Sequence, residues 1–390
     1  MTLSHWQRSE QGTSVNCDIA VVGGGIVGTS SAYWIKKLGR QKRIALVEAK
    51  TIGYGASGRN AGFLLQGAAV DYATDIEKYG IENARLLWSF SQENRDLIAS
   101  ELDPAKIRFE GGGSLILAGS DAEDARLQKS AALLQGLGKN VTYWSAQEIR
   151  QKVKGDGFEG GLYVGSGARV HSQKLVREIA GLSGAIILEN HPVFAVEQHA
   201  QGVKLITPSR TIIAEQVIFC LNAYLPQLFP ETSAYVRPVR AQMLATNPQP
   251  NWLDYPVYSH EGFYYVRQLK TGAILVGGAR HLFAEEEVGY EDLTTSGLQG
   301  ALKDYLMRSF PHLGNIISDY AWSGTMGFTS DGLPVISPLS SLPGCYWAAG
   351  FNGHGMGYGF RFGKLVAEVL NDRIDEDPYH HMFDVKRFTK

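Results

Sequence analysis

The feature that most constrains this chain is a short glycine run, Gly23-Gly24-Gly25, between an apolar segment and a helical one. The apolar residues 17–22 predict a strand, and residues 29–38 predict a helix that packs back onto it. A second apolar run, residues 43–47, predicts a neighbouring strand that ends at Glu48. A strand, a tight glycine turn, a helix and a strand ending in a carboxylate are the layout of a dinucleotide-binding unit.

The glycines of this unit have separate physical tasks. Gly23 permits the sharp turn out of the strand, Gly25 allows the backbone to approach a pyrophosphate, and Gly28 allows the helix to pack close to the strand. The unpaired N–H groups and the dipole at the helix start then attract the phosphates. Glu48 lies 20 residues beyond Gly28 (48 − 28), where a carboxylate accepts from a ribose 2′-hydroxyl and disfavours a 2′-phosphate. The motif fits FAD and NAD equally.

Composition places the chain among globular proteins and argues against several partners. It has 390 residues, 44% hydrophobic and 19% charged, which is enough for two or three structural units. The formal net charge of −2 does not favour nucleic acid or an anionic membrane as a partner. No apolar run reaches the roughly 18 residues of a membrane span. Residues 1–16 are polar and lack a signal-peptide core, so we expect a cytoplasmic protein.

The cysteines and histidines do not suggest a metal site. Cys17, Cys220 and Cys345 lie far apart in strand-like runs, so we expect buried thiols rather than a disulfide framework or zinc site. His171 precedes a helix for which Ser172 is a suitable N-cap. No second ligand stands at metal spacing beside His171, and we therefore expect no metal.

A long loop of small residues, 49–63, follows the second strand. It is either a flexible surface loop or a backbone surface that lies against a flat cofactor. Its density of small residues beside a single arginine favours the second interpretation, with Ser57, Arg59 and Asn60 as polar contacts.

The rest of the chain predicts two kinds of sheet. Helical periodicity predicts helices at residues 81–102, 121–137, 173–180 and 297–310, and Ser145 starts a capping box. Apolar runs predict strands at residues 185–188, 193–197, 202–207 and 216–221. The last strand ends at Asn222, where it can face a ligand. Short strands at residues 236–246, 256–259, 262–268 and 273–277, separated by turn signals, predict a distinct antiparallel sheet.

Polar side chains along this antiparallel sheet have two interpretations. Arg240 and Gln242 share one face of a strand, and Tyr264-Tyr265 precede Arg267 on another. They form either an ordinary solvated face with half-buried tyrosines or a polar wall over a bound substrate.

The C-terminal region holds a second strand–glycine turn–helix unit. Residues 345–349 predict a strand, residues 350–359 are rich in glycine, and residues 360–370 predict a helix. A reduced flavin carries negative charge around N1–C2=O, which the positive end of a helix would stabilise. Two such units fit one long cofactor that is held at its pyrophosphate and at its ring.

These segments resemble a known family, the FAD-dependent D-amino-acid oxidase-like superfamily. Its relevant branch includes glycine oxidase, sarcosine oxidase and gamma-glutamylputrescine oxidase. The matching stretches are residues 21–49, the loop GASGRNAG at 55–62, the strand end at 221–223, and residues 322–337 and 348–368. They occur in the family order over nearly the whole chain.

The resemblance implies an α/β protein with two domains. One is a three-layer, Rossmann-like FAD-binding domain assembled from residues 1–80, 155–232 and 321–390. The other is a smaller α+β substrate domain, residues 81–154 and 233–320, with a mixed, largely antiparallel sheet that covers the flavin ring.

The resemblance also implies positions for the cofactor contacts. The pyrophosphate and ribose contacts would be Gly23, Gly25, Ile26, Val27, Gly28, Glu48 and Ala49. Contacts along the pyrophosphate and flavin would be Ser57, Arg59, Asn60, Ala61 and Gly62. Val193 would lie near the adenine, with Asn222 at the strand end beside the cofactor. Gly353, His354, Gly355 and Met356 would lie by the pyrimidine edge of the ring.

Three departures from the family pattern bear on the chemistry. No cysteine stands near Thr325-Met326, so FAD should be held non-covalently. The arginine that pairs with the substrate carboxylate in amino-acid-specific members would stand at about Met326, so Arg240, Arg267 or Arg59 would have to replace it. No lysine of the sarcosine-oxidase type stands at residues 274–276, which leaves the electron acceptor open.

The resulting expectation is a flavoenzyme that oxidises a C–N bond of a small amine or amino acid. A hydride passes to flavin N5, the imine is hydrolysed, and oxygen is the expected acceptor. The expected substrate contacts are Tyr264, Tyr265, Arg240, Gln242 and Met326, with His354 on the flavin side. The alternatives are a dehydrogenase that passes electrons to a quinone or carrier, a non-catalytic flavin-binding subunit, and a plain NAD dehydrogenase. We expect no nucleic-acid partner, no membrane span, and a monomer or small homo-oligomer.

Overall fold

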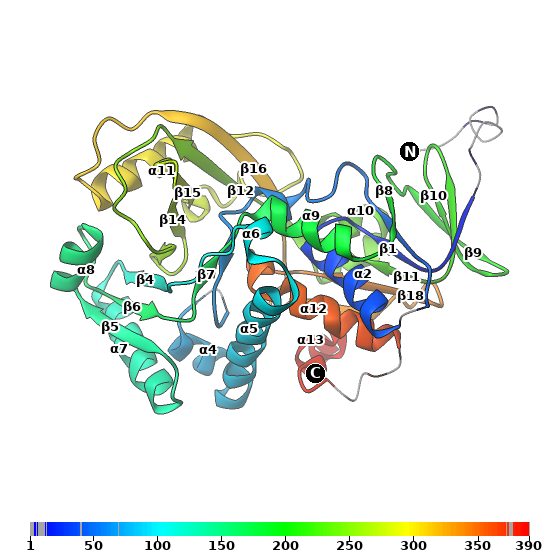
Figure 1. The fold of residues 1–390 in the computed structure, drawn as a ribbon, viewed down its shortest axis with the longest axis horizontal. Helices are drawn as coiled ribbons and strands as arrows, with labels where there is room; N and C mark the ends of the chain where they lie inside the picture. Colours follow the sequence, from blue (N-terminus) through cyan, green and yellow to red (C-terminus); the bar gives the residue numbers. More distant parts are fainter. Residues whose placement is uncertain are drawn as a thin grey trace.

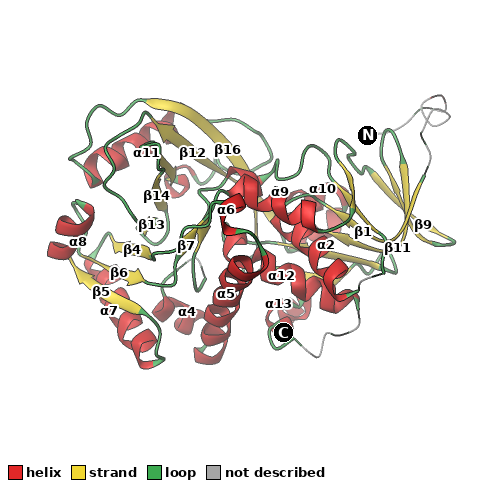
Figure 2. Ribbon diagram, in the orientation of Figure 1, coloured by secondary structure: helices red, strands yellow, loops and turns green. Residues whose placement is uncertain are grey.

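Two eight-stranded sheets in separate lobes organise the chain (Figure 1). The computed structural model describes residues 4, 6, 12, 14–39, 41–68, 70–371, 373 and 377–389. The expectation of a missing signal-peptide core applies to residues 1–16, most of which lie outside this set. In Figure 2 the two long strands β12 and β16 cross from one lobe toward the other, with helices on the outside of both sheets.

The first sheet has the order β17-β18-β11-β1-β2-β8, and β9 and β10 extend it from β11. Its strands are β1 (Val15–Val22), β2 (Ile44–Val47), β8 (Ile186–Leu188), β9 (Ala195–His199), β10 (Gly202–Ile206), β11 (Thr211–Phe219), β17 (Val335–Pro338) and β18 (Cys345–Ala349). β1 pairs in parallel with both β2 and β11. Parallel strands are buried on both faces, which explains the continuous apolar run that predicted β1.

Alternate residues of β1 separate the two faces of this sheet. Ile19 and Val21 pack in one hydrophobic cluster with helix residues. Ala20 and Val22 pack in a second cluster, which includes residues of β10 and β11. The helices associated with this lobe are α2 (Ile26–Leu38), α5 (Ile81–Glu101), α9 (Ser172–Leu182), α10 (Leu225–Leu228), α12 (Gly355–Leu370) and α13 (His380–Phe383). The Rossmann-like layering expected from the sequence is confirmed.

The second sheet has the order β16-β12-β15-β14-β13-β4-β6-β5. Its strands are β4 (Ser114–Ala118), β5 (Val141–Ser145), β6 (Gly160–Val164), β12 (Arg237–Thr246), β13 (Val257–Ser259), β14 (Tyr264–Gln268), β15 (Ile274–Gly278) and β16 (Ser318–Phe328). β13 and β4 run parallel, and the other neighbours run antiparallel. The expected mixed, largely antiparallel sheet is therefore confirmed.

Four helices are associated with the second sheet and its connections: α4 (Tyr72–Tyr79), α7 (Asp121–Gly136), α8 (Ala146–Val153) and α11 (Ser296–Ser309). The short helix α6 (Pro104–Ile107) instead packs on α9, with Ile107 in the core of the first lobe. A short helix α3 (Ala56–Arg59) and a two-stranded pair, β3 (Phe63–Leu64) with β7 (Ala168–Arg169), join the lobes.

Sheet membership differs from the expected domain boundaries at three places. β6 and β16 belong to the second sheet, whereas a boundary at 155 would assign β6 to the FAD-binding part and a boundary at 321 would divide β16. α5 packs against α12, with Leu87 and Phe90 in the core of the first lobe. The periodicity of α5 predicts a helix but does not show which sheet its apolar side contacts.

Two helix starts test the capping predictions. Ser145 and Glu148 form the expected capping box at α8. Ser172 is not the N-cap of α9, because His171 holds that position and its Nδ1 accepts from the Lys174 amide at 3.4 Å. Ser172 is instead the first helical residue, and its hydroxyl donates to the Asn60 carbonyl at 3.3 Å.

Helices α2 and α12, which lie far apart in the sequence, pack on each other. A Cβ on Gly359 would lie 2.8 Å from Ile26, and one on Gly363 would lie 2.4 Å from Ser30. Glycine at these positions therefore permits a close helix contact. The C-terminal glycine unit is thereby held beside the N-terminal one.

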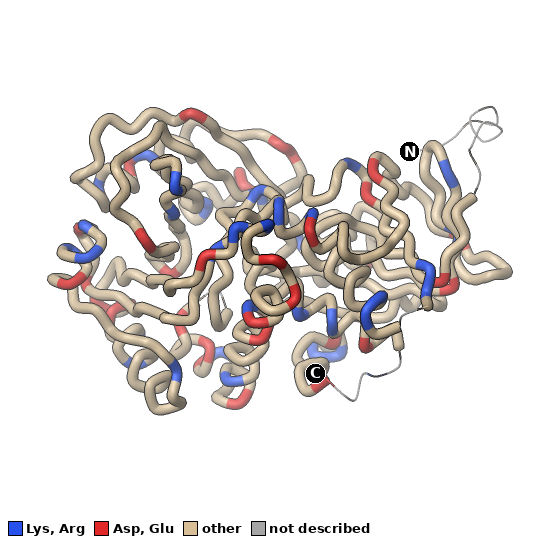
Figure 3. The backbone as a smooth tube through the Cα atoms, in the orientation of Figure 1, with Lys and Arg blue, Asp and Glu red and all other residues tan. Residues whose placement is uncertain are grey.

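Charged residues of both signs are interspersed over both lobes (Figure 3). Among the described residues, no helix combines the length and apolar character needed to cross a membrane. The same residues include no group of three His, Cys, Asp or Glu side chains placed to hold a metal ion. Cys17, Cys220 and Cys345 are buried free thiols, as expected.

Candidate functional site

The glycine turn after β1 is packed too closely for side chains. A Cβ on Gly23, which has φ of 113°, would lie 2.5 Å from the Cys220 carbonyl oxygen. A Cβ on Gly28 would lie 1.8 Å from the Gly23 carbonyl oxygen. The turn and the helix start therefore approach β1 and β11 in the way that a phosphate-binding turn requires.

The N-terminus of α2 is open to an anion. Gly25 is its N-cap and supplies no side-chain cap, and the first turn carries no acidic residue. The Ile26 amide donates to the Ser57 hydroxyl at 2.9 Å, which brings the loop at residues 49–63 against this helix end. Positive partial charge at a helix start whose own first turn carries no carboxylate suits a pyrophosphate.

Glu48 lies at the end of β2, beside the glycine turn. Its Oε2 accepts from the Gly24 amide at 2.7 Å, and its Oε1 accepts from the Lys50 amide at 2.8 Å. Burial raises the pKa of this carboxyl above its usual value. Each carboxylate oxygen can accept a second hydrogen bond, so Glu48 can also receive a ribose hydroxyl. Ala49 follows directly and is exposed.

A cavity of about 90 Å³, here called the inner cavity, lies where the two lobes meet. Its lining residues are Asn60, Ala61, Phe63, Tyr258, Gly262, Tyr265, Arg280, Met326, Asn352, Gly353 and Met356. It combines the loop after β2, the hairpin β13–β14, strand β16 and the start of α12. Asn60, Ala61, Tyr265, Met326, Gly353 and Met356 are residues that the sequence analysis had singled out.

Three hydrogen-bond donors of the inner cavity have no protein acceptor within the described part of the chain. They are the hydroxyls of Tyr258 and Tyr265 and the guanidinium of Arg280. The Arg280 guanidinium carbon lies 5.8 Å from the centre of the Phe263 ring and 5.3 Å from that of Phe328. Burial raises the pKa of Tyr265 to about 12, and the Arg280 charge opposes that rise. No carboxylate is among the lining residues, so the cavity suits an anionic ligand group.

Arg280 and Tyr258 were not found by sequence reasoning. Arg280 lies two residues beyond the end of β15, so a charged residue just past a strand end was the available signal. Tyr258 lies opposite Tyr265 on the neighbouring strand β13. Only the pairing of the two strands shows that both rings reach one cavity.

Arg240 and Gln242 do share a face of β12, but that face does not line the inner cavity. The Arg240 guanidinium donates to Glu287 Oε1 at 2.8 Å and Oε2 at 3.0 Å. Gln242 Nε2 donates to the same Oε1 at 2.7 Å. The Arg240–Glu287 pair is buried, with side-chain exposures of 3% and 1%. These residues hold the segment around Glu287 on the sheet, so the structure does not support them as substrate contacts.

Tyr264 also points away from the inner cavity. Its ring stacks on Tyr305, with centroids 4.0 Å apart, in the core of the second lobe. Neighbouring residues of a strand face opposite sides, so only Tyr265 of the Tyr264-Tyr265 pair reaches the inner cavity.

The other two candidate arginines have protein partners. Arg59 pairs with Asp292 at 2.7 Å and donates to the Ser323 carbonyl at 2.9 Å. Arg267 donates to the Ala61 carbonyl at 2.9 Å and the Val170 carbonyl at 2.6 Å. Burial lowers the pKa of Arg267 to about 10. Arg267 thus fixes the backbone beside Ala61 rather than facing the inner cavity.

The start of α12 is fixed by buried contacts. His354 is its N-cap residue, and its ring packs on Tyr358 with centroids 4.8 Å apart. Burial lowers the pKa of His354 to about 4, so the imidazole is neutral near pH 7. Asn222 Oδ1 accepts from the Gly350 amide at 2.9 Å, which ties the end of β11 to the glycine turn. α12 begins at Gly355, five residues before the expected start, and no acidic residue lies in its first turn.

Two further cofactor candidates have defined surroundings. Gly62 has φ of 77°, and a Cβ there would lie 2.1 Å from the Val170 carbonyl oxygen. Val193 is partly buried against the hydrophobic cluster that includes residues of β10 and β11. Both belong to segments that follow strands of the first sheet or lead into them.

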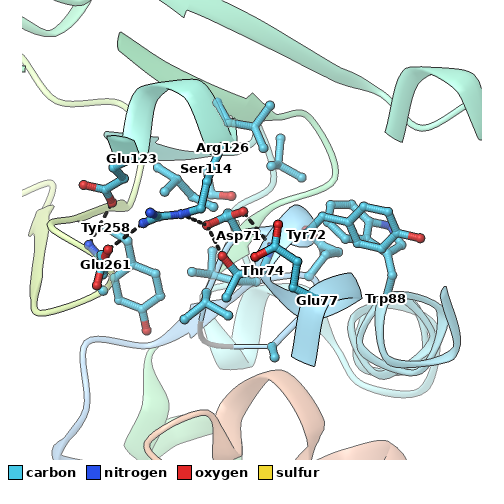
Figure 4. A pocket seen from close by; sticks show the side chains of 18 residues that line it. Asp71, Tyr72, Thr74, Glu77, Trp88, Ser114, Glu123, Arg126, Tyr258 and Glu261 are labelled. Carbon is cyan, nitrogen blue, oxygen red and sulfur yellow. Dashed lines mark hydrogen bonds and ion pairs between the residues drawn. The ribbon is translucent and has the colours of Figure 1, made fainter. Parts of the chain in front are cut away.

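Figure 4 shows the side chains that line a larger cavity of about 280 Å³, here called the outer cavity. Tyr258 and Gly262 line both cavities. Arg126 of α7 bridges Asp71, which precedes α4, and Glu261, which lies between β13 and β14.

Comparison with known proteins identifies relatives over almost the whole chain. The family model described as "FAD dependent oxidoreductase" (DAO) matches residues 18–369. The chain is 28% identical over 371 residues to the gamma-glutamylputrescine oxidoreductase of Escherichia coli strain K12, covering 92% of this chain and 84% of that protein. It is 26% identical to the glycine oxidase of Geobacillus kaustophilus strain HTA426, covering 90% and 92%.

Solved structures share the fold. The crystal structure of glycine oxidase from Geobacillus kaustophilus matches with a TM-score of 0.76 and 22% identity, over 92% of this chain and 96% of that one. The crystal structure of L-proline dehydrogenase from P. horikoshii matches with a TM-score of 0.80 and 22% identity, over 96% and 98%.

Proposed function

The chain belongs to the FAD dependent oxidoreductase family, and on that premise we propose that it oxidises the C–N bond of a small amine or amino acid at the inner cavity. The relatives named as oxidising an amine or an amino acid support this substrate class. The observation that carries the proposal is the inner cavity itself. It joins the glycine-rich start of α12 and the loop after β2 to a set of unpartnered donors from the second sheet.

The chain offers a contact for each part of FAD. The turn from Gly23 to Gly28 and Ser57 would hold the pyrophosphate, and Glu48 would hold the ribose. The loop at residues 60–62 and the start of α12 would lie against the ring. When bound there, FAD supplies the acceptor for a hydride from the carbon next to the amine nitrogen.

The residues of the inner cavity bind and orient the substrate. Arg280, Tyr258 and Tyr265 donate to its carboxylate or another electron-rich group, which fixes the reacting carbon. Phe63 and Met326 form apolar walls that exclude water. The Arg280 charge and the absence of a lining carboxylate lower the pKa of a bound amine, so the amine is held neutral.

A neutral amine is the form that can react. Its lone pair becomes the new C=N bond as the hydride leaves the carbon with its electron pair. Water then adds to the imine carbon, and the amine or ammonia leaves. No general base is required once the amine is neutral, which agrees with a cavity that lacks one.

The test is an aerobic assay of the purified holoprotein with a panel of amines and amino acids. We expect oxygen uptake matched by hydrogen peroxide and by released ammonia or amine. Absence of both oxygen uptake and reduction of an artificial quinone with every compound, while FAD remains bound, would favour the non-catalytic subunit and contradict the proposal.

A dehydrogenase is the second candidate and differs only in the acceptor. Strand β15 carries no lysine that could supply charge beside the ring for oxygen chemistry. Reduction of an artificial quinone by the same substrates without oxygen uptake would favour this candidate over the oxidase.

A further inference from the structure

The outer cavity adjoins the inner one and differs from it in charge. The two have Tyr258 and Gly262 as common lining residues. The outer cavity is lined by the carboxylates of Asp71, Glu77, Glu123 and Glu261, with Arg126 as its one lining cation. The inner cavity offers one cation and no carboxylate.

Two of the four carboxylates are committed to the protein backbone. Glu123 is buried and accepts from the Gly119 and Glu261 amides, each at 2.7 Å. Asp71 caps α4 by accepting from the Thr74 amide at 3.1 Å. These two carboxylates fix the walls of the outer cavity rather than offering a ligand an open oxygen.

The other two carboxylates are more accessible. Glu77 pairs with Lys129 at 3.2 Å, and both side chains are more than half exposed. Glu261 pairs with Arg126 at 2.5 Å and is 54% exposed. Exposed ion pairs of this kind exchange readily for another cation because each is worth little.

One lining residue of the outer cavity carries a buried acceptor that is unpaired within the described part of the chain. Gln66 is 7% exposed, and its Nε2 donates to the Ser166 carbonyl at 3.2 Å. Its Oε1 is buried and has no hydrogen-bond partner among the described residues. A buried acceptor without a donor is costly, so a donor from a ligand would stabilise it.

We propose that the outer cavity binds a cationic group at the far end of the substrate. The substrate class is then an amine or amino acid with a second ammonium or guanidinium group, several bonds from the reacting carbon. This assignment rests on the proposed function, because it places the reacting end in the inner cavity. The contrast in charge selects one orientation, with the neutral amine near Arg280 and the distal cation near Glu77 and Glu261.

The test compares ligands that differ only at the far end. Anaerobic isothermal titration calorimetry of the holoprotein measures dissociation constants for lysine against norleucine and for cadaverine against n-pentylamine. We expect the ligand with the distal ammonium to bind at least tenfold more tightly in each pair.

The variants Glu77→Gln and Glu261→Gln keep the side-chain size and remove the charge. We expect each to lose a large part of the preference and the double variant to lose all of it. Glu261→Lys should reverse the preference toward a ligand with a distal carboxylate. Glu215→Gln, which removes an exposed charge on β11 in the other lobe, should leave the preference unchanged.

The outcomes separate this inference from the proposed function. Equal binding within both pairs, or no binding of any of the four ligands, would overturn the distal-cation site. A preference that survives in the double variant would overturn it as well. Binding with the expected preference, but no reduction of the flavin by any amine, would instead overturn the proposed function.

Discussion

At the scale of the residue, Arg280 determines the charge of the inner cavity. We predict that Arg280→Met raises KM about 30- to 100-fold for substrates with a carboxylate, because a buried charge pair is lost. Substrates without a carboxylate should change by less than about threefold. Steady-state kinetics on a matched amino acid and amine measure both effects.

The matched control for Arg280 is Arg308→Met, which removes an exposed arginine of α11 outside the inner cavity. It should leave both KM values unchanged. An equal rise of KM for both substrate types in Arg280→Met would contradict a carboxylate-binding role and indicate a general loss of structure.

Glu287 is predicted to be a structural residue. Glu287→Leu leaves Arg240 buried without its main anion, since Glu291 is 3.7 Å away and largely exposed. We expect a loss of about 3–5 kcal/mol in the free energy of unfolding, measured by denaturant titration. The double variant with Arg240→Leu should recover part of the loss. A loss below about 1 kcal/mol would show that the pair is not buried as described.

Asp75 makes stability depend on pH. It is fully buried, and burial raises its pKa to about 7. The pKa of Asp75 is higher in the folded state than in the unfolded state. Its contribution to the free energy of unfolding is therefore fully present below about pH 4 and is lost as the pH rises to about 7. We predict that the free energy of unfolding of Asp75→Asn rises relative to that of the wild type. The rise is about 1.4 kcal/mol for each pH unit across this window.

Thermal or denaturant unfolding between pH 4 and 8 measures this gain. His354, with its pKa lowered to about 4, has the opposite sign, since its protonation destabilises the fold as the pH falls. It is present in both proteins and cancels in the difference. A constant difference across the pH range would contradict the raised pKa of Asp75.

At the scale of the element, the turn between β1 and α2 depends on the lack of a side chain at Gly28. A Cβ there would lie 1.8 Å from the Gly23 carbonyl oxygen, so Gly28→Ala must displace the helix or the strand. We predict at least tenfold less bound FAD and a lower melting temperature. Flavin absorbance per protein measures the cofactor content.

Gly55→Ala is the matched control for Gly28→Ala. Gly55 lies in the neighbouring loop with φ of −72°, and a Cβ there would meet nothing within 4 Å. Its FAD content should equal that of the wild type. A full complement of FAD in Gly28→Ala would contradict the role assigned to the turn.

Local elements were largely predictable because their signals are local. The parallel strands, α5, α7 and the capping box of α8 all lie where periodicity and caps predict them. The predicted N-cap of α9 was wrong because serine is only one of several residues whose side chains can accept a hydrogen bond from a helix amide. The sheet membership of β6 and β16 was not predictable from the sequence, because a strand does not encode its neighbour.

At the scale of the whole molecule, the site is built from segments that are distant in sequence. Residues from the loop after β2, the β13–β14 hairpin, β16 and α12 meet at the inner cavity. Sequence motifs identified the cofactor segments, because glycine turns have a local pattern. They did not separate Tyr265 from Tyr264 or find Arg280, because those assignments depend on which face of a strand meets the other lobe.

The most direct test of the central claim is an anaerobic titration of the purified holoprotein with amines and amino acids, followed by its absorption spectrum. The account predicts that one class of these compounds bleaches the flavin band in proportion to the substrate added. It also predicts that the protein without substrate stays yellow. A protein that contains no flavin, or bound FAD that no amine or amino acid reduces, would contradict the account.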